Sequence, residues 1–213
     1  AAEAQTILNG MAATFIANNF EIAPVLRQLF SSEHFFDETA IGVIIKSPFD
    51  LYFNLIKENN FGYTDGTVIN FLDASAMIGQ ELWDPVDVAG WQRDRQWINT
   101  NYIIGRWLTS EVFIEQFFQA NQEQFRTLAI NAVGAVSNPN DPDEYARAII
   151  DSFLPKGLLT EQNYQTAIGV FREPYNDSGY YETNSWQIML EDTPSQVFLL
   201  LLHIVREPEY QLK

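Results

Sequence analysis

The sequence predicts an all-α protein: an irregular multi-helix domain with a long, ordered connector rich in tryptophan. Apolar residues recur at three- and four-residue steps through much of the 213-residue chain, which is the period of an amphipathic helix. Ser-Pro, Asp-Pro and Thr-Pro pairs stand at the start of several of these runs, as a capping residue and proline do at a helix start. No stretch of useful length alternates with the period of two of a strand. Because the composition shows no sharp break, we expect one α-helical domain over residues 1–213.

The part of the chain before the connector predicts four helices. One covers Ala4–Phe20, a second lies around residues 25–30, a third starts at Ser47-Pro48, and a short fourth follows a loop over Asn59–Gly66. Their expected buried positions are, in order, Ile7, Leu8, Met11, Phe15 and Ile16; Val25, Leu26, Leu29 and Phe30; Leu51, Leu55 and Ile56; and Val68, Phe71, Leu72, Ser75 and Met77.

The connector is predicted over Gly79–Ile98, which contains proline and glycine and has no sustained period. Asn99 or Thr100 caps the next helix, which we expect to break at Thr109-Ser110. Another helix starts near Phe113, and its Phe113, Phe117 and Phe118 stripe is expected in the core rather than on a docking face.

Three further helix starts lie in the second half of the chain. Asp141-Pro142, Thr160 and Thr193-Pro194 introduce expected helices over residues 142–153, 161–172 and 194–206. The acidic, tyrosine-rich stretch 173–192 is expected to be a long surface loop with aromatic anchors rather than a binding loop.

Charge and composition exclude several classes of function. The 28 acidic and 12 basic residues give a net charge of −16, and such a field repels nucleic acids and anionic lipid surfaces. The absence of cysteine excludes disulfides, thiolate metal sites and cysteine nucleophiles. The longest apolar run, Val197–Leu202, is too short for a membrane span. We expect no nucleic-acid partner, no membrane span and no cofactor.

Four stretches of the sequence resemble the bacterial proteins collected as domain of unknown function 1800, in the carboxy-terminal half of those proteins. They read LRQLFSSEHFFD at Leu26–Asp37, IKSPFDLYFNLI at Ile45–Ile56, MIGQELWDPVDVAGWQRDRQWINT at Met77–Thr100, and LLLHIVREPEYQLK at Leu200–Lys213. Their order and spacing make the resemblance specific for about half of the chain. The region 120–190 carries no such resemblance. The chain departs from the family pattern at Pro85-Val86 and at Gln92-Arg93-Asp94.

The resemblance implies a helical, often exported bacterial protein with a periplasmic or extracellular location. It supplies no catalytic residues. Family members look about twice as long as this chain, which begins at Ala1 inside an expected helix. We therefore expect the chain to be the carboxy-terminal part of a longer protein, with the remaining amino-terminal half or another protein as its partner.

The candidate site lies in residues 77–107, which hold Trp83, Trp91, Trp97 and Trp107, four of the five tryptophans. Either these rings anchor the connector or they stack on a flat ligand. In the second case the ligand is a glycan, with Trp91 or Trp97 stacking on the sugar and Asp84, Asp87 or Asp94 polarising it. The candidate binding residues are Trp91, Trp97, Arg93, Asp84, Asp87 and Asp94.

Structural roles are an alternative for these residues and for the other polar clusters. The carboxylates of the connector also suit turn formation or pairing with arginines. The oxygen-rich segments 138–144 and 176–178 do not match the spacing of a calcium loop, and His34 and His203 stand alone, so no metal site is expected. Nucleophile and phosphate-loop motifs are missing from the sequence.

Two hypotheses of function follow. The first is a non-catalytic structural or interaction module of a larger exported bacterial protein, with no enzymatic activity of this chain alone. The second is a carbohydrate-binding or carbohydrate-active domain that uses tryptophan stacking and the carboxylates of the connector.

Overall fold

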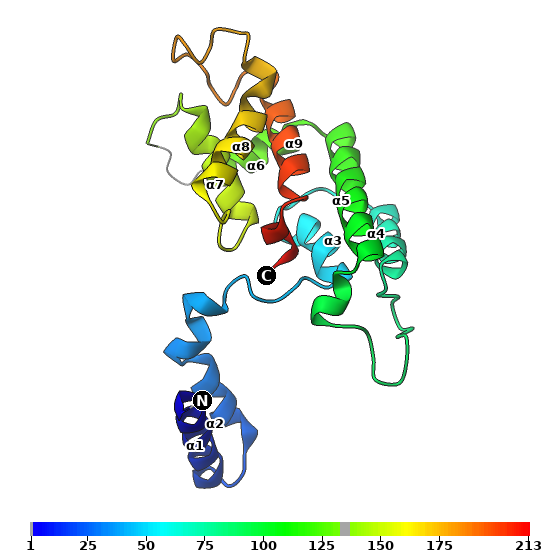
Figure 1. Ribbon diagram of the computed structural model, residues 1–213, viewed down its shortest axis with the longest axis vertical. Helices are drawn as coiled ribbons and strands as arrows, with labels where there is room; N and C mark the ends of the chain where they lie inside the picture. Colours follow the sequence, from blue (N-terminus) through cyan, green and yellow to red (C-terminus); the bar gives the residue numbers. More distant parts are fainter. Residues whose placement is uncertain (1, 133–136) are drawn as a thin grey trace. The chain divides into compact units, whose positions relative to one another are not determined.

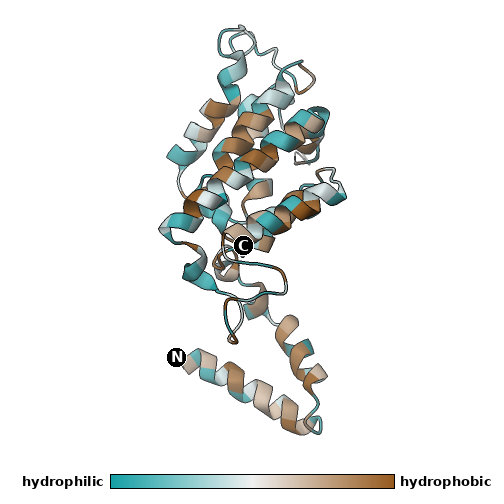
Figure 2. Cartoon of the chain, turned by 90° about the vertical axis from the view of Figure 1, so that its right-hand side faces the viewer, coloured by the Kyte–Doolittle hydropathy of each residue, from teal (hydrophilic) through white to brown (hydrophobic). Residues whose placement is uncertain are grey.

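The computed structural model describes residues 2–132 and 137–213. This part of the chain holds nine α-helices and no β-strand beyond two isolated bridges, Ile45 with Leu212 and Asp87 with Gly90, which confirms the all-α prediction (Figure 1). The chain divides into two compact units, residues 1–41 and 42–213. In Figure 2 most helices carry both apolar and polar turns, as amphipathic helices do.

Residues 1–41, the first unit, form a helical hairpin. Helix α1 (Ala2–Ala17) packs against α2 (Ile22–Phe30), and the turn between them passes through Asn19 and Phe20 at positive φ. Two short 3₁₀ turns follow, η1 (Glu33–Phe36) and η2 (Glu38–Ala40). Helix α1 has no buried residue and α2 only Val25, so this hairpin buries little of its own apolar surface.

The second unit begins with two capped helices. Helix α3 (Pro48–Lys57) starts after Ser47, whose hydroxyl accepts a hydrogen bond from the Asp50 amide while the Asp50 carboxylate accepts one from the Ser47 amide. Helix α4 (Asp65–Met77) has the same reciprocal cap on Thr64, and the two helices pack together. The predicted Ser47-Pro48 start is therefore confirmed.

Helix α5 (Thr100–Ala120) is continuous, so the predicted break at Thr109-Ser110 is wrong. Thr109 Oγ1 donates to the Gly105 carbonyl at 2.6 Å, a hydroxyl bond to the preceding turn that a helix accommodates. The same oxygen lies 2.5 Å from Tyr52 Oη, and Ser110 is fully buried. Packing of this face against α3 therefore outweighs the weak helix preference of the two residues.

Four more helices complete the second unit. They are α6 (Glu123–Ala132), α7 (Pro142–Phe153), α8 (Glu161–Arg172) and α9 (Thr193–Ile204), of which α6 was not predicted. Helix α9 packs against α5, α6, α7 and α8 and carries seven buried residues. Its apolar face joins one continuous core that includes Phe113 and Phe117, with Phe118 packed at its edge, which confirms the predicted core role of the phenylalanine stripe.

The segment 173–192 is an irregular chain held by aromatic anchors, as predicted. It starts with the 3₁₀ turn η4 (Glu173–Tyr175), and its Trp186 is fully buried and donates to Gln196 Oε1 at 2.9 Å. The buried Arg126 of α6 donates to the Leu190 carbonyl at 2.8 Å. These bonds replace the regular backbone pairing that the segment lacks.

The carboxy-terminal end of the chain returns to the start of α3. After the 3₁₀ turn η5 (Pro208–Gln211), the Lys213 amide donates to the Ile44 carbonyl at 2.8 Å and the Lys46 amide donates to the Gln211 carbonyl at 2.8 Å. The buried Arg106 of α5 closes this junction, because its Nε donates to Gln211 Oε1 at 2.7 Å and its Nη2 to the Lys46 carbonyl at 2.8 Å. Residues from three distant parts of the sequence therefore meet at one point.

Candidate functional site

The tryptophan-rich connector is irregular but specifically hydrogen-bonded. It turns at Asp87, whose carboxylate accepts from the Ala89 amide at 2.7 Å and whose carbonyl accepts from the Gly90 amide at 3.1 Å, with Gly90 at φ +99°. A short 3₁₀ turn, η3 (Asp94–Trp97), leads to α5. Asp87 therefore fills the turn-forming role that competed with ligand binding in the sequence analysis.

The four tryptophans of this region differ in their surroundings. Trp97 is buried, with 4% of its surface exposed, and Trp91 is half-buried, with its Nε1 donating to the Glu81 carbonyl at 2.8 Å and its ring edge-on to Phe49. Trp107 is also half-buried. Trp83, by contrast, is 86% exposed at φ +65°, so of these four rings it is the one that does not anchor the connector.

Four of the six predicted site residues line one cavity of about 450 Å³, which we call the Trp91 cleft. They are Trp91, Trp97, Arg93 and Asp94, and they share its wall with Ile44, Ile45, Ser47, Asp50, Gln80, Ala89, Gln92 and Lys213. Asp84 and Asp87 are exposed and do not line the cleft. The buried Trp97 offers no open ring face, so any stacking in this cleft falls to Trp91.

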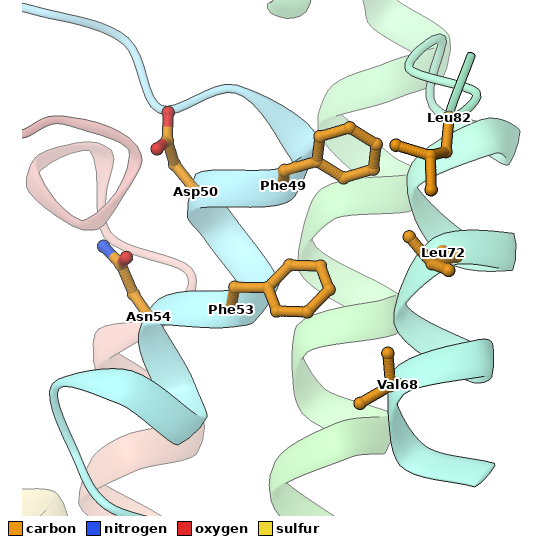
Figure 3. A pocket seen from close by; sticks show the side chains of 7 residues that line it. All are labelled: Phe49, Asp50, Phe53, Asn54, Val68, Leu72 and Leu82. Carbon is orange, nitrogen blue, oxygen red and sulfur yellow. The ribbon is translucent and has the colours of Figure 1, made fainter. Parts of the chain in front are cut away.

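A second cavity of about 450 Å³, which we call the apolar groove, lies between α3 and α4 (Figure 3). In Figure 3 the rings of Phe49 and Phe53 point from α3 toward the side chains of α4 and of Leu82, while Asp50 and Asn54 point away from them. The lining consists of Phe49, Asp50, Phe53, Asn54, Val68, Leu72 and Leu82. The groove is therefore walled almost entirely by apolar groups.

A third cavity, of about 380 Å³, lies on the other side of α3 and is named here the Lys46 cavity. It is lined by Lys46, Asp50, Asn54, Glu58, Ser152, Phe153, Pro155 and Lys213. Asp50 thus contributes to all three cavities.

The Asp50 carboxylate is held as an anion. Partial burial acts to raise its pKa, but hydrogen bonds from Lys213 and from Ser47 outweigh that effect and lower the pKa below its ordinary value. Lys213 Nζ lies 2.5 Å from Asp50 Oδ2 and forms an ion pair with it. This pair separates the Trp91 cleft from the Lys46 cavity, since both of its members line each of them.

Lys46, Asp50 and Lys213 were missed in the sequence because their role depends on distant contacts. The Asp50–Lys213 pair joins residues 163 positions apart. One local signal does exist: Lys46 follows the apolar run Val43–Ile45 and precedes a helix cap, an unusual place for a solvated lysine.

Among the described residues, no group of three or more His, Cys, Asp or Glu side chains is placed to hold a metal ion. None of the helices described in the structure combines the length and apolarity that a membrane crossing requires.

Comparison with known proteins identifies a family. The family model described as "Protein of unknown function (DUF1800)" matches residues 1–212, and this range includes the region 120–190, which was not among the stretches that carry the resemblance. No curated protein and no solved structure matches the chain.

Proposed function

The chain belongs to the DUF1800 family, and from this premise we propose that residues 42–213 form a non-catalytic interaction module of a longer, exported bacterial protein. The observation that carries the proposal is the apolar groove. Phe49 and Phe53 from α3 face Val68 and Leu72 from α4 across a cavity of about 450 Å³ that opens to the surface (Figure 3). Apolar surface of this kind, left uncovered, is typical of a site that receives apolar side chains of a partner.

Charge around the groove selects the partner. Residues 58–92, which include the α4 wall of the groove and Leu82, contain six acidic residues and no basic one, between Lys57 and Arg93. A partner with apolar anchors and flanking lysines or arginines complements both features. We therefore assign the groove to an amphipathic, basic segment of another polypeptide, in the helix-in-groove mode of recognition.

A pair of synthetic peptides tests this assignment. A helical peptide built of leucine and lysine is titrated against the protein by fluorescence anisotropy, beside a peptide in which glutamate replaces lysine. We expect the lysine peptide to bind and the glutamate peptide to bind at least tenfold more weakly, with the difference shrinking at high salt because screening weakens charge attraction. Equal binding of the two peptides contradicts the proposal.

A matched pair of variants locates the binding. Leu72→Asp places a charge in the groove, whereas Leu159→Asp places the same charge at a leucine that is 84% exposed and does not line it. The added carboxylate attracts a basic peptide, so a loss of affinity in Leu72→Asp reports the lost apolar contact and not repulsion. We expect at least a tenfold loss for Leu72→Asp and little change for Leu159→Asp; the same effect from both variants places the peptide elsewhere.

A second candidate function is carbohydrate binding in the Trp91 cleft. The favouring observation is the meeting of the half-buried Trp91 with Arg93, Asp94 and the Asp50–Lys213 pair around one cavity, which supplies a ring face and polar partners for hydroxyl groups. Asp50 does not supply the carboxylic acid with a raised pKa that a glycosidase needs, because its pKa is lowered. We therefore assign this cleft to sugar binding.

Two tryptophan variants test the carbohydrate candidate. Trp91→Ala removes the half-buried indole of the cleft, while Trp83→Ala removes an exposed indole outside it. A glycan array, followed by titration of each positive sugar against intrinsic fluorescence, is expected to show binding by the unchanged protein and by Trp83→Ala but not by Trp91→Ala. A blank array, or equal loss in both variants, removes this candidate.

A further inference from the structure

The backbone of Lys46 is fixed from both sides. Its amide donates to the Gln211 carbonyl at 2.8 Å, and its carbonyl accepts from Arg106 Nη2 at 2.8 Å. The next residue, Ser47, is the cap of α3. The side chain therefore leaves a rigid point of the chain, and only 4% of the residue's surface is exposed.

The side chain lines the Lys46 cavity, whose other polar members are Asp50, Asn54, Glu58, Ser152 and Lys213. Lys46 Nζ lies 4.2 Å from the centre of the Tyr210 ring. Within residues 2–132 and 137–213 the amine makes no hydrogen bond or ion pair. A buried amine without a carboxylate partner, open to a polar cavity, has its lone pair available for chemistry.

Burial favours the neutral form of the Lys46 amine. Burial is the largest effect and lowers the pKa of Lys46 from its ordinary 10.5 to about 8; Glu58 and Asp50 act to raise it, whereas Arg106 and Lys213 act to lower it. At pH 8 a lysine of this kind carries roughly a hundredfold more neutral amine than an ordinary lysine. Neutral amine is the nucleophilic form.

We propose that Lys46 forms an imine with the carbonyl group of a small, polar aldehyde or ketone bound in this cavity. The neutral Nζ adds to the carbonyl carbon, so that a C–N bond forms and the π electrons move to the oxygen. Transfer of a proton from nitrogen to that oxygen gives a carbinolamine, and loss of water breaks the C–O bond and leaves the imine. The sequence is reversible and needs no oxidant or reductant.

The Lys46 cavity also supplies the groups that this sequence needs. Glu58 carries a carboxylate that accepts and returns the transferred proton, while Asp50 stays ionised beside Lys213. Asn54 and Ser152 are neutral hydrogen-bonding residues suited to ligand hydroxyl groups. A cavity of about 380 Å³ admits a small molecule and no polymer. The ligand class is therefore a hydroxylated aldehyde or ketone.

Reductive trapping tests the proposal on the unaltered protein. The folded chain is incubated with glycolaldehyde and sodium cyanoborohydride near pH 7.5, and the adduct on each of the four lysines is measured by peptide mass spectrometry. Allowing for restricted entry to the cavity, we expect the adduct to form about tenfold faster at Lys46 than at the exposed Lys57 and Lys156. The preference disappears in urea, because unfolding removes the burial that sets it apart. Labelling of Lys57, Lys156 or Lys213 at the same rate or faster overturns the proposal.

Two variants separate chemistry from structure. Lys46→Arg keeps a cation over the Tyr210 ring but forms no imine under these conditions, and Asn54→Ala alters the cavity while leaving the amine in place. We expect no adduct at position 46 in the first, with labelling elsewhere unchanged, and a slower adduct in the second for glycolaldehyde but not for acetaldehyde, which lacks the hydroxyl. If Lys46→Arg does not fold, the rate of adduct formation at Lys46 relative to the other lysines, measured in the unaltered protein and in Asn54→Ala, still tests the proposal. Equal slowing with both aldehydes in Asn54→Ala shows general damage and removes the assigned ligand class.

Discussion

Replacing Lys46 with methionine makes the stability of the protein less dependent on pH. Burial lowers the pKa of Lys46 in the folded chain to about 8, while the unfolded chain keeps the ordinary value of 10.5. Between these values the unfolded chain holds one more proton at this position, so the free energy of unfolding rises with pH. The cost of burying the charged amine is fully present below pH 8 and vanishes above pH 10.5. At 1.36 kcal/mol per pKa unit it amounts to about 3 kcal/mol.

The change in stability is best measured between about pH 7 and about pH 9.5. Over that range the two pKa values predict that about 2 kcal/mol of the cost disappears. Buried tyrosines act in the opposite direction near pH 10, because burial raises the pKa of Tyr52 to about 12 and raises that of Tyr210 as well. Since both proteins keep these tyrosines, their effect cancels when Lys46→Met is compared with the unaltered chain.

Urea unfolding followed by tryptophan fluorescence measures the effect at several pH values across this window. We expect the stability of Lys46→Met relative to the unaltered protein to fall by about 2 kcal/mol from pH 7 to pH 9.5. Lys156→Met, a change at an exposed lysine, is the control and runs parallel to the unaltered chain. Parallel curves for Lys46→Met as well refute the reasoning, because the amine then has the same pKa in both states.

Three further changes test how the second unit is held together. Trp186→Phe removes the indole N–H from a fully buried site and leaves an acceptor without its partner, for a loss of about 2–4 kcal/mol in urea unfolding; a loss below 1 kcal/mol shows that the acceptor finds another donor. Ser47→Ala breaks the reciprocal cap of α3 and lowers stability by about 1 kcal/mol in calorimetry; no change means that the Lys213 contact alone holds this end. At Gly157, with a φ of +66°, an added Cβ clashes with Tyr164 Oη, whereas at Gly179, with a φ of +76°, it meets open space. We therefore expect Gly157→Ala to lower the melting temperature more than Gly179→Ala. Equal effects assign the loss to backbone strain alone.

Helix starts were predictable from the sequence because capping is local. Ser47, Asn99, Asp141 and Thr160 each accept a backbone amide with their side chains at the expected positions. Helix α9 starts one residue earlier than predicted. Thr193 already lies in the helix, and the cap position is Asp192, which makes no side-chain cap bond. A Thr-Pro pair fits both registers, so the pattern alone does not decide between them.

Tertiary contacts explain what the sequence pattern missed in the fold. The predicted break at Thr109-Ser110 rested on weak helix propensity, which the packing of α5 against α3 overrides. Helix α6 was overlooked although its buried Phe125, Leu128 and Ala129 recur at three- and one-residue steps, because its other positions are polar. Its Arg126 is buried only through carbonyl groups of residues 188–191, more than 60 positions away.

The candidate site was predictable in part for the same reason. Trp91, Arg93, Asp94 and Trp97 are near neighbours in sequence, so one connector brings them together. Asp84 lies outside the cleft and stands before the turn at 87–90, whereas the four residues that line the cleft follow it. The opposite wall of the cleft comes from the start of α3 and from residue 213, which no local pattern joins.

Helix geometry explains how one short helix separates an apolar groove from a polar cavity. A helix turns about 100° per residue, so positions 49 and 53 share one face, and positions 50 and 54 share the next. Phe49 and Phe53 point into the groove, and Asp50 and Asn54 point away from it (Figure 3). Phe53→Ala is therefore expected to weaken the basic peptide at least tenfold and to leave glycolaldehyde labelling of Lys46 unchanged, while Asn54→Ala does the reverse. If each substitution alters both readouts equally, α3 does not separate two sites, and the groove and the cavity have to be treated as one.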